Sequence, residues 1–289
     1  MSRLALGTVQ FGLAYGVANH GGQVSRPAAK AMLKLSTENG VDTLDTAIAY
    51  GESEACLGEV GTDGFKVVSK LPALPEFFED IHAWVQAQVA LSLARLGVSS
   101  LYGLLLHCPE QLLEAHGNSL YLALLRLRES GQVQKIGVSI YDPDQLNALV
   151  SRYHFDLVQA PLNLVDRRLE ASGWLQRLKD EGIEVHTRSA FLQGLLLMPQ
   201  ADLPARFLPW SDLLARWHGW LASRDISAVQ ACLAYPLSLP GIDRVVVGAD
   251  SVSQLSQILD AVAGASLRDF PDLQCDDEDL INPASWNPS

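Results

Sequence analysis

The chain has 289 residues, of which 48% are hydrophobic and 19% charged, an ordinary balance for a globular protein. It contains no run of about 18 consecutive apolar residues, the length that indicates a membrane-spanning helix, so we expect no membrane segment. Its 33 acidic residues outnumber its 21 Lys and Arg, and the net charge of -12 argues against nucleic acid as a partner.

Eight short apolar segments, rich in aliphatic and β-branched residues, recur between stretches that contain Gly and Pro. Such segments are typical of β-strands. We expect strands at residues 4–7, 43–45, 66–69, 102–106, 136–139, 157–160, 184–187 and 245–247.

Segments with helical periodicity lie between these strands, at residues 27–39, 81–96, 120–130, 144–152, 169–181 and 251–263. Because the strands are continuously apolar, they are typical of a parallel sheet that helices cover on the outside. Eight such strands predict one α/β domain over residues 1–289 with the (β/α)8 TIM-barrel fold. An open, doubly wound sheet is the alternative, but its first strand should lead into a G-x-G-x-x-G turn, and the glycines here lie scattered in a long loop.

The N-terminal residues run directly into the first expected strand, without the apolar stretch and cleavage site of a signal peptide. The cysteines form no C-x-x-C pair and the seven histidines show no close ligand spacing. We therefore expect a cytoplasmic protein with isolated thiols and no bound metal. The four cysteines are Cys56, Cys108, Cys232 and Cys275.

The C-terminal stretch, about residues 265–289, is acidic. Six Asp and Glu residues lie between Asp269 and Asp279, with no Lys or Arg among them. We expect a solvated, partly mobile tail, in which Trp286 is the residue best suited to docking.

Four polar side chains stand where three neighbouring strands are expected to end. Asp45 and Tyr50 follow the second strand, Lys70 the third and His107 the fourth. Functional residues of a (β/α)8 barrel gather at these carboxyl ends, so the four should lie close together. Taken singly, each has an ordinary structural interpretation: a helix cap, half-buried packing, a solvated strand end and a loop histidine.

Together the four suit the reduction of a carbonyl group. The developing alkoxide needs a proton donor, and a tyrosine, with an ordinary pKa of about 10, needs help to give up its proton. Lys70 would favour the tyrosinate and Asp45 would hold Lys70 charged and in place. His107 could hydrogen-bond the substrate oxygen.

Seven motifs then occur in a fixed order along the chain. They are Leu6-Gly7-Thr8, Asp45-Thr46-Ala47-Ile48-Ala49-Tyr50-Gly51, Ser69-Lys70, Leu106-His107, Gly137-Val138-Ser139, Gln159-Ala160-Pro161-Leu162-Asn163, and Ser189-Ala190-Phe191-Leu192-Gln193-Gly194. This series, which covers almost the whole chain, resembles the successive signatures of the aldo-keto reductase family.

The resemblance implies a catalytic tetrad of Asp45, Tyr50, Lys70 and His107, with Ser139 and Gln159 holding the nicotinamide carboxamide. It implies further contacts to a dinucleotide cofactor from the ends of the first, seventh and eighth strands, namely Thr8, Arg188, Ser189, Phe191, Gly194, Gly248, Ser251 and Gln254. The loop at residues 10–24 and the segment at 198–217 should overhang the barrel mouth, with Tyr15, His20 and Trp210 as pocket residues.

Three positions depart from the family pattern. Ile140 stands where the family usually has an Asn that also contacts the carboxamide. Arg188 stands where many members stack an aromatic ring on the nicotinamide; its planar guanidinium could stack likewise, or it could be a salt-bridged loop residue. The segment from Gly248 to Leu255 contains no Lys or Arg, whereas many members hold the 2′-phosphate of NADP there with basic residues.

The cofactor choice therefore stays between NADP(H) and NAD(H). Asp250 would repel a 2′-phosphate or accept a hydrogen bond from a ribose hydroxyl. The family as a whole favours NADP, and backbone N–H groups after Gly248 could bind a phosphate, so the preference leans slightly to NADP(H).

The expected function is an NAD(P)H-dependent oxidoreductase that reduces an aldehyde or ketone, a sugar or keto-sugar among the possibilities. The chain is expected to act on a small-molecule carbonyl substrate as a monomer or homodimer. One alternative is a non-catalytic, nicotinamide-binding regulatory subunit on the same fold. Another is a barrel lyase that uses Lys70 to form a Schiff base.

Overall fold

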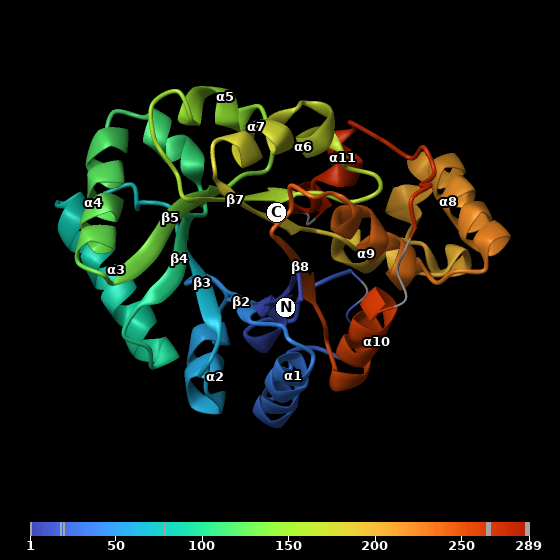
Figure 1. Cartoon of the computed structure of the whole chain (residues 1–289), viewed down its shortest axis with the longest axis horizontal. Coiled ribbons are helices and arrows are strands. Elements are labelled where there is room, and N and C mark those ends of the chain that lie inside the picture. Colours follow the sequence, from blue (N-terminus) through green and yellow to red (C-terminus); the bar gives the residue numbers. More distant parts are fainter. Residues whose placement is uncertain (1, 18, 20, 78, 264–266, 287–289) are drawn as a thin grey trace.

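A computed structural model describes residues 2–17, 19, 21–77, 79–263 and 267–286. Within these residues, eight parallel strands close into a barrel in the order in which they occur along the chain, which confirms the expected (β/α)8 fold (Figure 1). The strands are β1 (Leu4–Gly7), β2 (Thr43–Asp45), β3 (Lys66–Leu71), β4 (Leu101–Leu106), β5 (Val133–Ser139), β6 (Leu157–Pro161), β7 (Glu184–Arg188) and β8 (Arg244–Gly248).

Helices lie around the outside of the barrel (Figure 1). Within the described residues they are α1 (Arg26–Glu38), α2 (Ser53–Val60), α3 (Ile81–Leu96), α4 (Gly117–Glu129), α5 (Gln145–Leu149), α6 (Arg168–Ala171), α7 (Trp174–Asp180), α8 (Ser211–Arg224), α9 (Ala228–Ser238), α10 (Val252–Ala263) and α11 (Glu278–Ile281). The single helix expected at residues 169–181 is instead two helices, because Gly173, with φ of +79°, interrupts it. The expected helix at residues 144–152 is confined to the five residues of α5.

The barrel closes where β1 pairs with β8. Gly7 lies opposite Gly248, and Leu4 lies opposite Val245. Arg3 reinforces this seam, because its guanidinium donates hydrogen bonds to backbone carbonyl oxygens of the segment that leads into β8. The first and last strands of the barrel are thus held together by backbone pairing and by the half-buried guanidinium of Arg3.

A small apolar cluster fills the inside of the barrel beneath its mouth. It consists of Val68, Leu105 and Leu157, all fully buried. Each lies two residues before a polar side chain on its own strand, and residues two apart in a strand point to the same face. The polar side chains that follow, Lys70, His107 and Gln159, therefore stand one layer higher, at the mouth.

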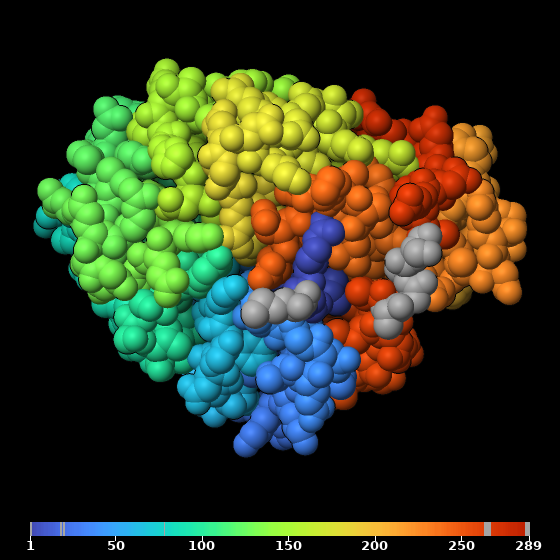
Figure 2. Space-filling model, viewed as in Figure 1, coloured from blue at the N-terminus to red at the C-terminus, as the bar shows by residue number. Residues whose placement is uncertain are grey.

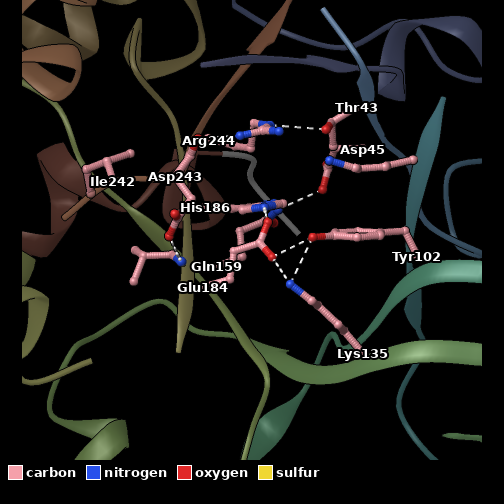
Figure 3. A network of polar contacts seen from close by, with 12 residues as sticks. Thr43, Asp45, Tyr102, Lys135, Gln159, Glu184, His186, Ile242, Asp243 and Arg244 are labelled. Carbon is pink, nitrogen blue, oxygen red and sulfur yellow. Dashed lines mark hydrogen bonds and ion pairs between the residues drawn. The ribbon is translucent and has the colours of Figure 1, made fainter. Parts of the chain in front are cut away.

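A polar network occupies the opposite, N-terminal end of the barrel (Figure 3). The carboxylate of Glu184 accepts hydrogen bonds from the hydroxyl of Tyr102 and from Nε2 of His186, each at 2.7 Å, and pairs with Lys135. Burial by itself raises the pKa of Glu184, but these three partners outweigh it and hold the pKa well below its ordinary value. The charges of Glu184 and Lys135 are therefore paired with each other inside the barrel, far from the mouth.

The acidic C-terminal segment is packed, unlike the solvated tail that the sequence predicts. Its acidic side chains are exposed, but Leu273, Leu280, Ile281 and Trp286 are buried. Residues 269–286 lie beside the segment that carries α8 (Figures 1 and 2). There the rings of Trp286 and Phe207 meet edge to face, with centroids 4.9 Å apart. The segment packs because the apolar side chains between its acidic residues lose contact with water when they cover an apolar surface of the barrel.

Within the described residues, no helix has both the length and the apolar character needed to cross a membrane.

Candidate active site

A buried ion pair forms the floor of the barrel mouth. Asp45 is the last residue of β2 and Lys70 lies near the end of β3. Nζ of Lys70 donates to Oδ1 of Asp45 at 2.7 Å and to the backbone oxygen of Thr46 at 2.9 Å. The two side chains are 1% and 6% exposed, so the pair is removed from water.

Lys70 also lies beneath Tyr50, which stands in the turn between β2 and α2. Nζ of Lys70 is 5.2 Å from the centroid of the Tyr50 ring. Burial lowers the pKa of Lys70, but Asp45 and Tyr50 outweigh burial and raise it above its ordinary value. Lys70 is therefore a cation at neutral pH, and because an ammonium has three donors, one remains beyond those given to Asp45 and Thr46.

His107 follows β4 and faces the same tyrosine. The two rings meet edge to face, with centroids 5.9 Å apart. Burial and the nearby charges of Lys70 and Arg188 lower the pKa of His107 to about 4. The imidazole is therefore neutral at physiological pH and can donate a hydrogen bond through one ring nitrogen without carrying a positive charge.

A chain of hydrogen bonds continues the site across the barrel (Figure 3). Nε2 of Gln159, on β6, donates to Oδ2 of Asp45 at 2.7 Å, so that both oxygens of this carboxylate are used. Oγ of Ser139, on β5, donates to Oε1 of Gln159 at 3.3 Å. The structure thus brings the expected tetrad and the two expected carboxamide contacts into one connected site. Ile140, by contrast, points into the core and offers no polar group.

These residues line a cavity of about 850 Å³ at the barrel mouth. Its wall includes most of the remaining residues singled out in the sequence, namely Thr8, Tyr15, Arg188, Ser189, Phe191, Gly194, Gly248 and Gln254. Two others do not line it. Ser251 caps the backbone N–H of Gln254, and Trp210 turns to the C-terminal segment, where its Nε1 donates to Asp277. His20 lies outside the described residues.

Arg188, the last residue of β7, stacks on a ring of the protein itself. Its guanidinium carbon lies 4.4 Å from the centroid of the Tyr141 ring, and Nη2 donates to the backbone oxygen of Ile140 at 3.0 Å. Within the described residues it makes no ion pair with a carboxylate. Arg188 therefore brings an uncompensated positive charge to the cavity, and that charge is one cause of the low pKa of His107.

The loop after β7 is held in an unusual backbone conformation. Ser189, Leu192 and Gln193 all have positive φ, between +48° and +65°. Nδ2 of the buried Asn163 donates to the backbone oxygen of Ser189 at 3.1 Å and helps to fix this path. Such strain is typical of loops that shape a binding site, and here it turns Ser189 and Gln193 toward the cavity.

Gln10 is a cavity residue that the sequence analysis missed. It is 8% exposed, and its buried Oε1 has no hydrogen-bond partner within the described residues. It lies against Gly248, where an added Cβ would come within 2.5 Å of its Nε2. Gly248 therefore leaves space that the Gln10 amide occupies. The sequence did indicate Gly248 at the end of β8 as a site residue. It could not indicate Gln10, because Gln10 precedes Gly248 by 238 positions.

Asn19 and Asp250 join the two loops at the seam of the barrel. Nδ2 of Asn19 donates to Oδ1 of Asp250 at 3.2 Å and to the backbone oxygen of Gly22 at 3.0 Å. This bond links the loop after β1 to the loop after β8 across the cavity rim. No local sequence signal pointed to it.

Comparison with known proteins agrees with this architecture. The sequence pattern of the Aldo/keto reductase family matches residues 3–269. An oxidoreductase of Bacillus subtilis, YqkF, is 23% identical over 253 residues, which cover 81% of each chain. Aldo-keto reductase YhdN of the same organism is 26% identical over 206 residues, covering 68% of this chain and 60% of that protein.

A solved structure shares the fold. Aldo-keto reductase AKR11C1 from Bacillus halodurans, in its holo form, superposes with a TM-score of 0.76 at 21% identity, covering 92% of this chain and 88% of that one. With the family pattern spanning nearly the whole chain, the protein is an oxidoreductase that belongs to the aldo/keto reductase family.

Proposed function

We propose that the protein uses a reduced nicotinamide dinucleotide to convert an aldehyde or ketone into an alcohol, with Tyr50 as the proton donor. The observation that carries this proposal is the buried cation of Lys70 beneath Tyr50, held by Asp45. A proton donor of this kind must lose its proton as the substrate oxygen gains one, and a fixed positive charge stabilises the phenolate that forms.

Each member of the tetrad has one role in this proposal. Tyr50 protonates the carbonyl oxygen. Lys70 stabilises the tyrosinate through its remaining N–H donor, and Asp45 keeps Lys70 charged and in position. His107, neutral because its pKa is about 4, donates a hydrogen bond that orients the carbonyl oxygen.

The residues around the tetrad fit the cofactor. When bound, the dihydronicotinamide supplies the hydride. Ser139 and Gln159 offer a hydroxyl and a free lone pair to its carboxamide, and the unpartnered amide of Gln10 offers a further polar contact. Gly248, whose missing side chain lets the Gln10 amide approach the end of β8, lines the same cavity wall and is placed to lie against the nucleotide.

The substrate end of the cavity combines aromatic rings with amides. Tyr15 and Tyr141 contribute rings, and Nε2 of Gln193 donates to the Tyr15 hydroxyl at 3.0 Å. Rings flanked by hydrogen-bonding groups suit a polar carbonyl compound such as a sugar or keto-sugar.

The two alternatives are less well supported. A Schiff base needs a neutral lysine, but Asp45 raises the pKa of Lys70. A non-catalytic subunit would not need four connected polar groups at the bottom of its cavity. The slight preference for NADP(H) that the sequence suggests rests on the family pattern, and the contacts of the tetrad do not bear on it.

The test is to purify the protein and measure NADH and NADPH binding by quenching of tryptophan fluorescence, together with the oxidation of each cofactor in the presence of a panel of aldehydes, ketones and ketoses. Tyr50→Phe should keep the dissociation constant and lower kcat by a factor of about 10² to 10⁴. If the protein binds neither cofactor at millimolar concentration, the proposed function fails.

A further inference from the structure

The positive charges of the cavity lie at its catalytic end. Within the described residues that line it, Lys70 and Arg188 are the only Lys or Arg side chains. Both act on His107, whose pKa they lower, so both stand beside the tetrad. Lys70 is engaged by Asp45, and Arg188 is stacked on Tyr141.

A dinucleotide is long, and its nicotinamide must lie at the tetrad for the hydride to reach the carbonyl. Its adenosine half must therefore lie away from both cations. In (β/α)8 barrels the loops after strands seven and eight, with a following helix N-terminus, commonly hold phosphate. Here Nε2 of Gln10, a hydrogen-bond donor, lies against Gly248 at the same place, and α10 begins four residues later.

Beyond that point the cavity wall is acidic or neutral. Asp250 lies two residues before α10, and Gln254, Gln257 and Ile258 line the cavity from one side of that helix. The carboxylate of Asp250 is held in place by Asn19. Asp202 also lines the cavity. Away from the tetrad, the described lining residues therefore offer the adenosine carboxylates and no Lys or Arg.

We infer that this site selects NAD(H) over NADP(H), and that Asp250 is the residue that disfavours the 2′-phosphate. The inference rests on the proposed dinucleotide-dependent function and narrows it. A phosphate monoester carries a charge of about -1.5 to -2 at pH 7 and is ordinarily held by Arg or Lys. A carboxylate in its place repels the phosphate, whereas it accepts a hydrogen bond from a ribose hydroxyl.

The experiment compares dissociation constants of NADH and NADPH, measured by calorimetry without substrate, for four proteins. In the wild type, the dissociation constant for NADPH should exceed that for NADH by at least about tenfold, which is 1.4 kcal/mol. Asp250→Asn, which keeps the size of the side chain, should bring the ratio close to one. Asp250→Arg should invert it.

Asp260→Asn is the matched control, because it removes the same charge from an exposed position of α10, the helix that follows Asp250. Its ratio should equal that of the wild type. A wild-type ratio of one or below overturns the inference and leaves the reductase proposal standing. A ratio that Asp250→Asn does not change overturns the role of Asp250. Absence of binding by both dinucleotides overturns the proposed function itself.

Discussion

Nζ of Lys70 lies 2.7 Å from Oδ1 of Asp45, with both side chains removed from solvent. Breaking such a pair leaves one charge buried without a partner. We therefore expect Lys70→Met to lower the free energy of unfolding by about 3–5 kcal/mol. Adding Asp45→Asn should recover much of that loss, because the uncompensated charge is gone, while carbonyl reduction stays absent. Urea denaturation of both variants measures this.

The exposed pair between Arg177 and Glu181 provides the control. Arg177→Gln should change the unfolding free energy by less than about 1 kcal/mol, as is usual for a solvated pair. Equal losses in the single variant Lys70→Met and in the double variant would show that packing, and not charge, makes Lys70 important.

The low pKa of His107 gives the protein a specific dependence on pH. An unfolded histidine takes up a proton near pH 6.5, whereas His107 in the folded protein, with a pKa of about 4, stays neutral. Between these values the unfolded chain binds more protons, so stability should fall as the pH drops from 6.5 toward 4. His107→Gln should flatten this part of the stability curve. An NMR titration of the His107 ring with a midpoint at 6.5 would contradict the prediction.

Glu184 should produce a second acid-sensitive contribution, at lower pH. Its folded pKa lies below the unfolded value of about 4.5. Its contribution to stability should therefore be fully present above pH 4.5 and should be lost as the pH falls through the lower, folded value.

Glu184→Gln should accordingly lower the free energy of unfolding at pH 7 by about 1–3 kcal/mol, because the partly exposed Lys135 and the buried His186 lose their carboxylate partner. It should leave kcat within about twofold, because Glu184 lies at the N-terminal end of the barrel, whereas the catalytic residues of (β/α)8 barrels lie at the C-terminal end. The exposed Glu181→Gln is the comparison. Loss of activity in folded Glu184→Gln protein would mean that the two ends of the barrel are coupled.

Gly248 should be intolerant of a side chain for one identifiable reason. A Cβ at this position would lie 2.5 Å from Nε2 of Gln10, which is itself buried. Gly248→Ala should lower the melting temperature and weaken dinucleotide binding. In a Gln10→Ala background, the same substitution should cost little stability. A double-mutant cycle measures this coupling, and additive effects would exclude the contact as the cause.

The sequence predicted the fold, and it predicted that Asp45, Tyr50, Lys70 and His107 lie together at the barrel mouth, because both depend on local patterns. Apolar runs indicate strands, and the polar residue after each run must lie at the mouth once the barrel closes. Asp45, Lys70 and His107 follow this rule directly.

What the sequence did not predict depends on contacts between distant segments. The approach of Gln10 to Gly248 and the bond from Asn19 to Asp250 both cross the seam between β1 and β8. The stacking of Arg188 on Tyr141 likewise joins two different strand ends. The packed C-terminal segment was missed because its acidic residues dominate its composition, whereas its buried apolar side chains decide its position.

The pairing of β1 with β8 also bears on how the chain folds during synthesis. Leu4 finds its partner Val245 only after more than 230 further residues have been made. Until then β1 presents one unpaired edge, which is the kind of surface that associates with other chains. The part of the cavity wall that is built from both sides of this seam, including Gln10 and Gly248, therefore forms in the last step of folding. A ribosome-bound chain that stops short of β8 should hold all four tetrad residues and still lack the part of the cavity wall that Gly248 contributes.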